Sequence, residues 1–163
     1  MLAMHKITLG LLLVAGTATG AHAVSGTATL TGHTSISVNP CGSLSRKFTA
    51  NIQVLADGTW SEQGDVTASG TYTAVGTKGR KFALTLDDAS RTAFLAIAQT
   101  EASQVCHIGV TITGSKQKSF AVVLNRTGTK LKLTFKYGVS GRAAGRAGHG
   151  VVTIHAKGTW TPD

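Results

Sequence analysis

The sequence is poor in several residue types, and each scarcity excludes a class of protein. It contains 2 Pro and 2 Cys among 163 residues, so it is neither collagen-like nor a small scaffold held by several disulfides. Acidic residues are also few, 7 against 16 Lys and Arg, which excludes a disordered acidic tail and gives a net charge of +9. Beyond residue 23 no apolar run is long enough for a transmembrane helix, so we expect one folded domain.

The first 23 residues have the layout of a secretory signal peptide. A short positive segment, residues 1–6, precedes the apolar run 7–15, and Ala21-His22-Ala23 supplies the small residues that a signal peptidase accepts. The apolar run is shorter than the roughly 20 residues that a bilayer span needs. We therefore predict cleavage near Ala23, export to the periplasm or the extracellular space, and a single folded domain over residues 24–163.

Cys41 and Cys106 are the only cysteines in the chain, and an exported protein can keep such a pair oxidised. We predict that they form a disulfide. A reactive Cys106 assisted by His107 is the alternative, but adjacent residues on a strand point to opposite faces and the chain has no CxxC pair.

Apolar and polar residues alternate along most of the remaining chain, which predicts strands buried on one face. The clearest segment is 130–139, where Leu, Phe, Tyr and Val alternate with Lys and Thr. Turn signals such as Asp57-Gly58 and Gly114-Ser115 separate the strands and predict antiparallel order. Eight segments show the pattern: 28–38, 48–54, 66–72, 82–86, 108–112, 120–124, 131–139 and 152–160. The fold is thus predicted as mainly β, closed as a small barrel because closure removes strand edges, with a β-sandwich as second choice.

Two segments interrupt this pattern. Asp87 or Asp88 can cap a helix, and apolar residues then recur at helical spacing, which predicts one amphipathic helix at about 88–105. Residues 138–150 are rich in glycine and predict a loop that carries Arg142, Arg146 and His149. Such a loop could surround an anion with charged side chains and backbone N–H groups.

A short motif recurs along the chain. Gly-Thr-Trp occurs at 58–60 and at 158–160, and Gly-Thr-Tyr occurs at 70–72. The G-x-W element resembles the first strand of lipocalins, and GTW followed by GTYTAVG resembles the start of avidins. The resemblance covers residues 58–76 and implies a calycin-like small β-barrel. The chain departs from both families because a strand pair precedes Trp60 and the predicted helix lies in mid-chain.

The positive charge is concentrated in the last part of the chain. Residues 24–115 contain six basic and six acidic residues, whereas residues 116–163 contain nine basic residues and one acidic residue. Within this basic part, alternate residues of two predicted strands place four lysines on exposed faces: Lys130, Lys132, Lys136 and Lys157. Such faces could contact an anionic surface, or could simply keep a strand soluble.

Three hypotheses for the function follow from these features. The first is an exported binding protein for an apolar or anionic-headed small molecule. Its candidate ligand-binding residues are Trp60, Tyr72, Phe82, Phe135, Tyr137, Trp160, Arg142, Arg146 and His149. The second is a structural or interaction protein of the cell envelope or extracellular space, which uses the four lysines on anionic surfaces. The third is a small outer-membrane barrel with Lys and Thr lining a polar lumen.

Catalytic motifs are missing from the sequence. It has no GxSxG, no HExxH and no CxxC pair, and its histidines are dispersed, so we predict neither an enzyme nor a bound cofactor nor a metal site. Nucleic acid is disfavoured as a partner because Phe120, Phe135 and Tyr137 have the parity of core residues and cannot stack on bases. The ligand and the oligomeric state stay open at this stage.

Overall fold

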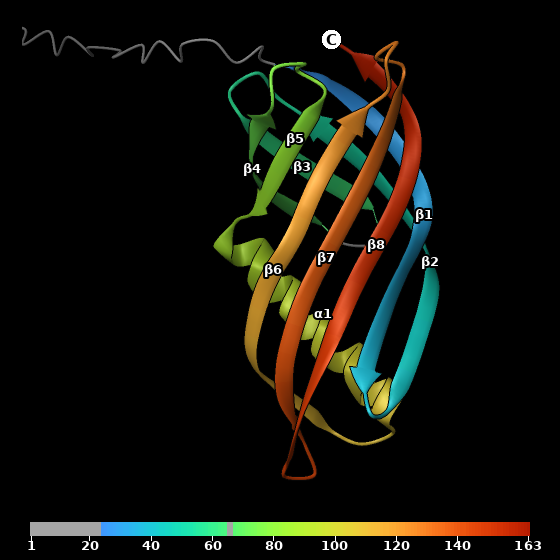
Figure 1. Cartoon of the computed structure of the whole chain (residues 1–163), viewed down its shortest axis with the longest axis vertical. Helices are drawn as coiled ribbons and strands as arrows, with labels where there is room; N and C mark the ends of the chain where they lie inside the picture. The colour runs from blue at the N-terminus through green and yellow to red at the C-terminus, as the bar shows by residue number, and fades with distance from the viewer. Residues whose placement is uncertain (1–23, 65–66) are drawn as a thin grey trace, which may run out of the picture.

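The computed structural model describes residues 24–64 and 67–163, which form a closed antiparallel barrel with one helix (Figure 1). Its elements are β1 (Gly26–Asn39), β2 (Gly42–Val54), β3 (Thr59–Gly64), β4 (Ala68–Val75), β5 (Lys81–Leu86), α1 (Asp88–Cys106), β6 (Val110–Leu124), β7 (Lys130–Ala143) and β8 (Arg146–Pro162). Each strand pairs with its neighbour in sequence, and β1 pairs with β8 to close the ring. The predicted barrel is confirmed, and the sandwich is wrong. The predicted signal peptide, residues 1–23, lies outside the described residues.

The two ends of the barrel are built differently. At the terminal end, the Asp163 N–H donates a hydrogen bond to Ser25 O (3.3 Å), so both ends of the described chain lie together. Strands β3, β4 and β5 have only 6, 8 and 6 residues, whereas the other five strands have 13 to 17. The hairpin end, which holds the turn between β7 and β8, is therefore enclosed by the five long strands and α1 (Figure 1).

Helix α1 occupies the gap that the short strands leave between β2 and β6. The Asp87 carboxylate accepts a hydrogen bond from the Ser90 N–H and caps the first turn. Farther along, Gln99 Oε1 accepts from the Ile112 N–H (2.9 Å), in a part of β6 that does not pair with β5. The predicted helix is thus confirmed. Among the described residues, no helix is both long and apolar enough to cross a membrane.

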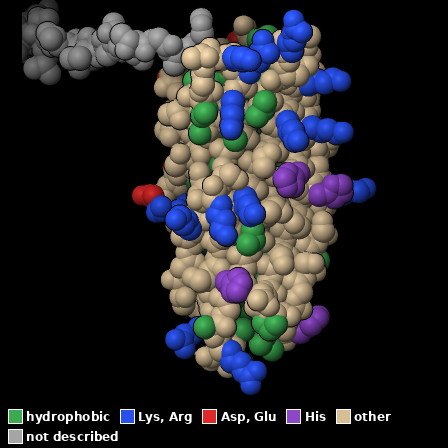
Figure 2. All heavy atoms as spheres, viewed as in Figure 1, with side chains coloured by type: hydrophobic (Ala, Val, Ile, Leu, Met, Phe, Trp, Pro, Cys, Tyr) green, Lys and Arg blue, Asp and Glu red, His purple; other side chains and the backbone are tan. Residues whose placement is uncertain are grey.

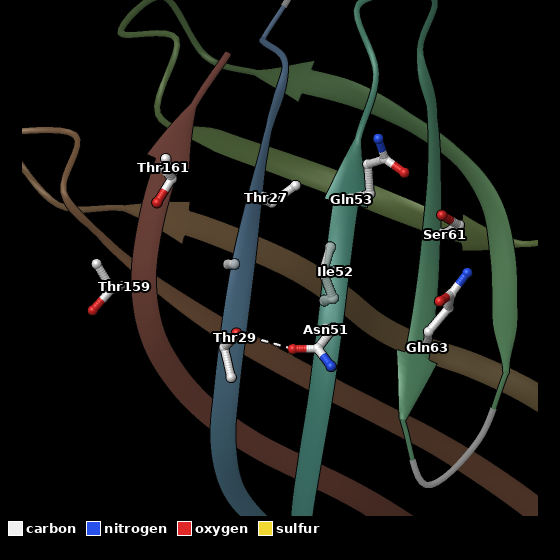
Figure 3. Close-up of a pocket in the computed structure, with 10 residues that line it drawn as sticks. Thr27, Thr29, Asn51, Ile52, Gln53, Ser61, Gln63, Thr159 and Thr161 are labelled. Atoms are coloured by element: carbon white, nitrogen blue, oxygen red, sulfur yellow. Dashed lines mark hydrogen bonds between the residues drawn. The ribbon is translucent and has the colours of Figure 1, made fainter.

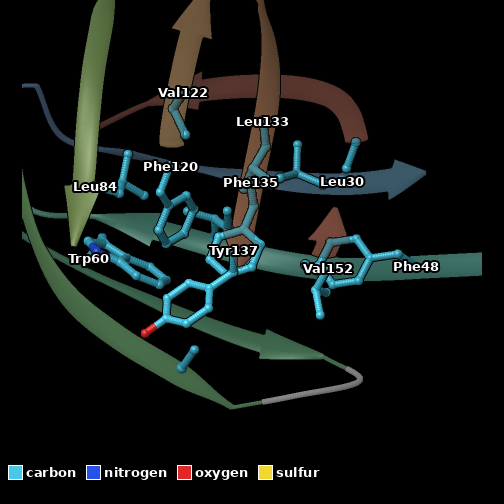
Figure 4. Packing of buried hydrophobic residues seen from close by; sticks show 14 of the residues in the cluster. Leu30, Phe48, Trp60, Leu84, Phe120, Val122, Leu133, Phe135, Tyr137 and Val152 are labelled. Carbon is cyan, nitrogen blue, oxygen red and sulfur yellow. The ribbon is translucent and has the colours of Figure 1, made fainter. Parts of the chain in front are cut away.

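Alternate residues of the strands point into one hydrophobic core (Figure 4). In β7, Leu131 and Leu133 are 2 % and 4 % exposed, whereas Lys130 and Lys132 between them are exposed. The predicted alternation is confirmed. Apolar side chains face inward and lysines face outward, which is the reverse of the orientation that the outer-membrane hypothesis requires.

The glycine-rich segment 138–150 is not a loop, contrary to the prediction. Strands β7 and β8 continue through it and are joined by Ala144 and Gly145, whose φ angles of 47° and 78° suit a two-residue hairpin turn. Main-chain hydrogen bonds form the ladder and need no bulky side chains, so a run of glycines can still pair as strands.

Strand boundaries differ from the prediction in two further places. Gly114 and Ser115, predicted as a turn, lie inside β6, so residues 110–112 and 120–124 of the two predicted segments belong to one strand. A register shift between Ile112 and Gly114 absorbs the irregularity without ending the pairing with β7. Residues 59–64 form β3, which the alternation did not reveal, so the total of eight strands is reached with a different set of segments.

Candidate functional site

The aromatic residues predicted to bind a ligand belong to the packed core. Trp60, Tyr72, Phe82 and Trp160 surround a cavity of only about 10 Å³ near the terminal end. A second cavity, beside Phe135 in the middle of the barrel, has about 60 Å³. Pockets for small molecules usually have roughly 300–1,000 Å³. In the structure described here, neither of these cavities has room for such a ligand.

Edge-to-face ring contacts hold the middle of this core together (Figure 4). The Phe120 ring lies 5.2 Å from Trp60 and 5.0 Å from Phe135, measured between ring centroids. Phe94 of α1 completes the row, 5.1 Å from Phe135 and 5.0 Å from Tyr137. These geometries are the favourable ones for aromatic pairs, so the rings stabilise the interior and fix the helix against it.

Tyr72 fastens the terminal end of the barrel. Its hydroxyl lies 2.8 Å from both Val24 O and Leu55 O and can donate to either, and its ring stands 5.6 Å from Phe82 in an edge-to-face contact. Burial is the main cause that raises the pKa of Tyr72 above its ordinary value. The half-buried side chain thus donates a hydrogen bond to the main chain at this end of the barrel.

A larger pocket, of about 420 Å³, opens at the hairpin end. The Cys41–Cys106 disulfide lies in its wall and joins the turn between β1 and β2 to the last residue of α1, so the predicted bridge is confirmed. The apolar part of the lining comes from three strands, from α1 and from the segment that follows it: Val38, Ala102, Ile108, Val110, Ile112 and Val139. We call this space the end pocket; its volume falls within the range of small-molecule sites.

The end pocket is hollow because the inward positions of the hairpin carry little side chain. By the alternation of β7 and β8 the small residues at inward positions are Gly141, Ala143, Gly148 and Gly150, whereas Arg146 is an inward residue with a long side chain. Glycine is also required for close approach of the strands, since a Cβ atom on Gly141 would lie 2.4 Å from the main-chain oxygen of Thr111. The glycines that predicted a loop therefore create the pocket within a paired hairpin.

Three nitrogen-bearing side chains surround the mouth of the end pocket. Arg146 occupies an inward position opposite Ala143, whereas Arg142 and His149 occupy outward positions of the same hairpin. Arg142 Nη1 donates to Gly145 O (3.4 Å). Within residues 24–64 and 67–163, no carboxylate forms an ion pair with either arginine. Their guanidinium groups can therefore donate charge-assisted hydrogen bonds to an anion.

The end of α1 shapes another side of the end pocket. His107 terminates the helix in the left-handed region, with φ of 55°, and its N–H donates to Gln104 O (3.4 Å). The chain then turns toward β6 and leaves Ile108 46 % exposed at the pocket edge. An apolar ligand that entered the pocket would cover this side chain.

The structure thus divides the predicted ligand site into two separate sets. Trp60, Tyr72, Phe82 and Trp160 lie at the terminal end, whereas Arg142, Arg146 and His149 lie at the hairpin end, with Phe135 and Tyr137 in the core between them. The prediction treated them as one site because sequence alternation shows which face a residue occupies, not its height in the barrel.

The four lysines predicted for an anionic surface are all exposed on the outside of β7 and β8. Lys132 and Lys157 are direct partners across the two strands, and Lys136 faces Thr153. Figure 2 shows Lys, Arg and His side chains spread over the face that these strands form, with Asp and Glu confined to its margins. The four lysines therefore lie on the side of the sheet opposite to the core, and their contact with an anionic surface stays a prediction.

Two buried polar residues and one exposed apolar residue were not singled out from the sequence. Glu62 and Ser90 are 8 % and 7 % exposed and border the cavity in the middle of the barrel. The spacing of Glu62 two residues after Trp60 places both on the inner face of β3 and was the available signal. Ile108 was interpreted as a core residue of a strand, whereas it precedes β6 and borders the end pocket.

The lining of the end pocket offers apolar contacts and hydrogen-bond donors. Ser140 and His149 are partners across β7 and β8. The Ser140 hydroxyl, however, lies toward β6 on the other side of its strand, because its Oγ atom is 2.7 Å from the position that a Cβ atom on Gly114 would take. In the described part of the chain, no group of three His, Cys, Asp or Glu residues could hold a metal ion. The lining of the end pocket can make apolar contacts with a ligand and can donate hydrogen bonds to an anion.

No family model, no curated protein and no solved structure matches the chain. The resemblance of residues 58–76 to the first strands of lipocalins and avidins implies a calycin-like barrel, and this stays a prediction. What the chain does must therefore be inferred from its own pocket, charges and surface.

Proposed function

We propose that the protein binds a small amphipathic anion, with an apolar body and a carboxylate or similar head group, in the end pocket. The observation that carries this proposal is an apolar pocket of about 420 Å³ whose mouth is surrounded by Arg142, Arg146 and His149. Apolar pockets with a few converging polar groups are the usual form of small-molecule sites.

The arrangement gives each part of the ligand a partner. The apolar body lies against Val38, Ile108 and Val139, where it removes apolar surface from water. The head group meets Arg146, the arginine at the inward position, and Arg142 adds a second positive charge at the mouth. No step of bond making or breaking is required, so the proposed role is that of a non-catalytic binding protein.

We further propose that binding takes place outside the cytoplasm. The Cys41–Cys106 disulfide supports this location, because such bridges persist in oxidising compartments. The signal-like layout of residues 1–23 points the same way.

The experiment that tests the function compares three probes that share a twelve-carbon chain: dodecanoate, dodecanol and dodecyltrimethylammonium. Calorimetric titration of the purified protein should show dodecanoate binding most tightly, since only its head group complements the arginines. Arg146→Gln should weaken dodecanoate binding by about tenfold, the scale of one lost charged hydrogen bond, and leave dodecanol binding unchanged.

A pocket-filling variant and a distant variant complete the design. Ala143→Phe adds an aromatic ring at an inward position of the end pocket and should abolish binding of both dodecanoate and dodecanol. Lys130→Gln removes a charge at the opposite end of β7 and should leave both affinities unchanged. Equal affinity for the three probes, or undiminished binding by a folded Ala143→Phe protein, would contradict the proposal.

A further inference from the structure

The outside of the barrel carries a second, independent concave surface. It is a groove of about 700 Å³ across four neighbouring strands, in the order β2, β1, β8 and β7. We call it the cationic groove, because five of its lining side chains carry nitrogen donors: His33, Lys47, Lys132, His155 and Lys157. It lies on the outer face of the sheet and is therefore separate from the end pocket.

Strand register brings these five residues together from distant parts of the sequence. His33 pairs with Lys47 on one side and with His155 on the other, so three donors form one row across β2, β1 and β8. Lys157 and Lys132 are partners in the next row, two residues along the strands. The five side chains thus form a block of two adjacent rows rather than a scattered set.

The floor of the cationic groove is close to the main chain. Gly32 and Ala156 stand between the donor residues at inward-facing positions and are partners across β1 and β8. The two strands are so close that a Cβ atom on Gly32 would lie 2.0 Å from the main-chain oxygen of His155. The main chain of β1 and β8 therefore forms the floor of the groove between the donor side chains.

The long strands that carry the cationic groove lack carboxylates. The five long strands β1, β2, β6, β7 and β8 contain no Asp or Glu, while ten of their residues are Lys or Arg. Figure 2 shows the resulting predominance of basic side chains over part of this surface. These five strands thus supply no carboxylate to neutralise the positive potential of the groove, which favours an anionic occupant.

A neutral polar groove, of about 460 Å³, continues along β8, β1 and β2 toward the terminal end and extends onto β3. Its outward side chains are hydroxyls and amides, several of them visible in Figure 3: Thr27, Thr29, Asn51, Gln53, Ser61, Gln63, Thr159 and Thr161. Thr29 Oγ1 donates to Asn51 Oδ1 (2.9 Å) in the row that follows Thr31 and Thr49 of the cationic groove. The two grooves are therefore consecutive parts of one surface, with charged donors in one and neutral donors and acceptors in the other.

We propose that this surface binds an acidic polysaccharide, whose carboxylate or sulfate groups meet the cationic groove and whose hydroxyl groups meet the neutral one. Such a chain carries both kinds of group along its length, which matches the two consecutive surfaces. A single-stranded nucleic acid usually stacks its bases on Phe, Tyr or Trp, and none of the outward residues that line either groove is one of these. A bilayer would present its charges in a plane rather than as a chain that fits a groove.

The test uses polygalacturonate fragments, which carry carboxylates and hydroxyls, against polyphosphate of equal charge and neutral dextran. We expect polygalacturonate to bind more tightly than either. The triple variant Lys47→Gln, Lys132→Gln, Lys157→Gln should lose at least about tenfold in affinity for it. A matched control, Lys78→Gln, Arg80→Gln, Lys81→Gln, removes the same charge from exposed positions around the turn between β4 and β5 and should change the affinity far less.

A double variant tests the neutral half of the surface. Thr29→Val with Asn51→Leu removes a hydroxyl and an amide and should weaken polygalacturonate binding while leaving polyphosphate binding unchanged.

Equal losses in the two triple variants would overturn the groove as the site. Tighter binding of single-stranded DNA, or of vesicles containing phosphatidylglycerol, than of polygalacturonate would overturn the polysaccharide as occupant. Dodecanoate titration of the same variants keeps this result distinct from that of the end pocket.

Discussion

At the scale of single residues, the two copies of Gly-Thr-Trp play different structural parts. Gly58 has φ of 89° and belongs to the turn before β3, whereas Gly158 lies inside β8 at an inward position. A Cβ atom on Gly158 would stand 1.9 Å from the main-chain oxygen of Thr29 in β1. Both tryptophans are nevertheless buried around the same small cavity at the terminal end, although one follows a turn and the other lies inside a strand.

This close approach predicts that Gly158→Ala destabilises the protein. The added methyl group meets main-chain atoms of β1 that cannot rotate away, so the free energy of unfolding should fall by about 1–3 kcal/mol, the usual range for an overpacked site. Urea denaturation followed by circular dichroism measures the effect. Gly109→Ala is the matched control, because no atom lies within 4 Å of its added Cβ, and equal stability of the two variants would refute the packing argument.

The sequence predicts which way a side chain faces better than it predicts what the side chain meets. Alternation places Leu131, Leu133 and Phe135 inward, and all three are buried. It cannot show that Phe135 packs on Phe94 from the helix, since that contact depends on where α1 crosses the barrel. The disulfide was predictable because only one internal pairing of two cysteines exists.

At the scale of elements, α1 acts as a substitute for strands. The Ser103 hydroxyl accepts from the Val110 N–H (3.0 Å), which is the second such contact with the start of β6. On the other side of the gap, Arg46 of β2 donates to Gln104 Oε1 (2.6 Å) and lies 3.9 Å from the Glu101 carboxylate. The helix thus joins both strand edges that β3 to β5 leave unpaired.

The N-terminal cap of α1 predicts a pH dependence of stability. Hydrogen bonds from Ser69 and then from Ser90 lower the pKa of Asp87 below its ordinary value. A lowered folded-state pKa gives stabilisation that is present above the unfolded-state pKa, near 3.8, and is lost as the pH falls through the lower folded value. Asp87→Asn, which can still cap but cannot ionise, should therefore be less stable than the natural protein at pH 6, with the gap narrowing as the pH falls below about 4.

Thermal unfolding of both proteins between pH 2 and pH 7 measures this dependence. Asp57 must be left intact in both, because hydrogen bonds from Thr59 lower its pKa as well and its contribution then cancels in the comparison. A stability gap that stays constant over the whole pH range would show that the Asp87 charge has no part in the cap.

The number and class of elements could be predicted, but not all of their boundaries. Capping residues and helical spacing located α1, since these signals are local in the sequence. The glycine-rich hairpin was misjudged because pairing depends on main-chain hydrogen bonds with a partner strand, which side-chain composition does not report. The bulge near Gly114 misled the prediction of β6 for the same reason.

At the scale of the whole molecule, the end pocket could not be found from the sequence. Its wall combines Val38 of β1, Ala102 of α1 and Val139 of β7, which come together only when the barrel closes and the helix docks. The excess of basic residues in the last third of the chain did predict that positive side chains border the pocket. It could not predict that Arg142 and Arg146 border an apolar cavity while the lysines lie on the outer face.

The disulfide predicts a large effect on global stability. It joins residues 65 positions apart, and closing a loop of that length stabilises the folded state by about 4 kcal/mol in the chain-entropy treatment. The double variant Cys41→Ser, Cys106→Ser should therefore unfold at a clearly lower urea concentration. Dithiothreitol should lower the midpoint of the natural protein to that of the variant and should leave the variant unchanged; a common midpoint without reductant would contradict the prediction.

Closure of the ring through β1 and β8 also sets an order in time. β1 precedes β8 by more than a hundred residues and pairs with it along almost its whole length, so β1 leaves the ribosome long before its partner exists. Contacts of such long range form slowly, because a large loop must close before any of them stabilises the chain. Until β8 is present, the ring cannot close and the core residues of β8, among them Val152 and Trp160, are missing from the interior.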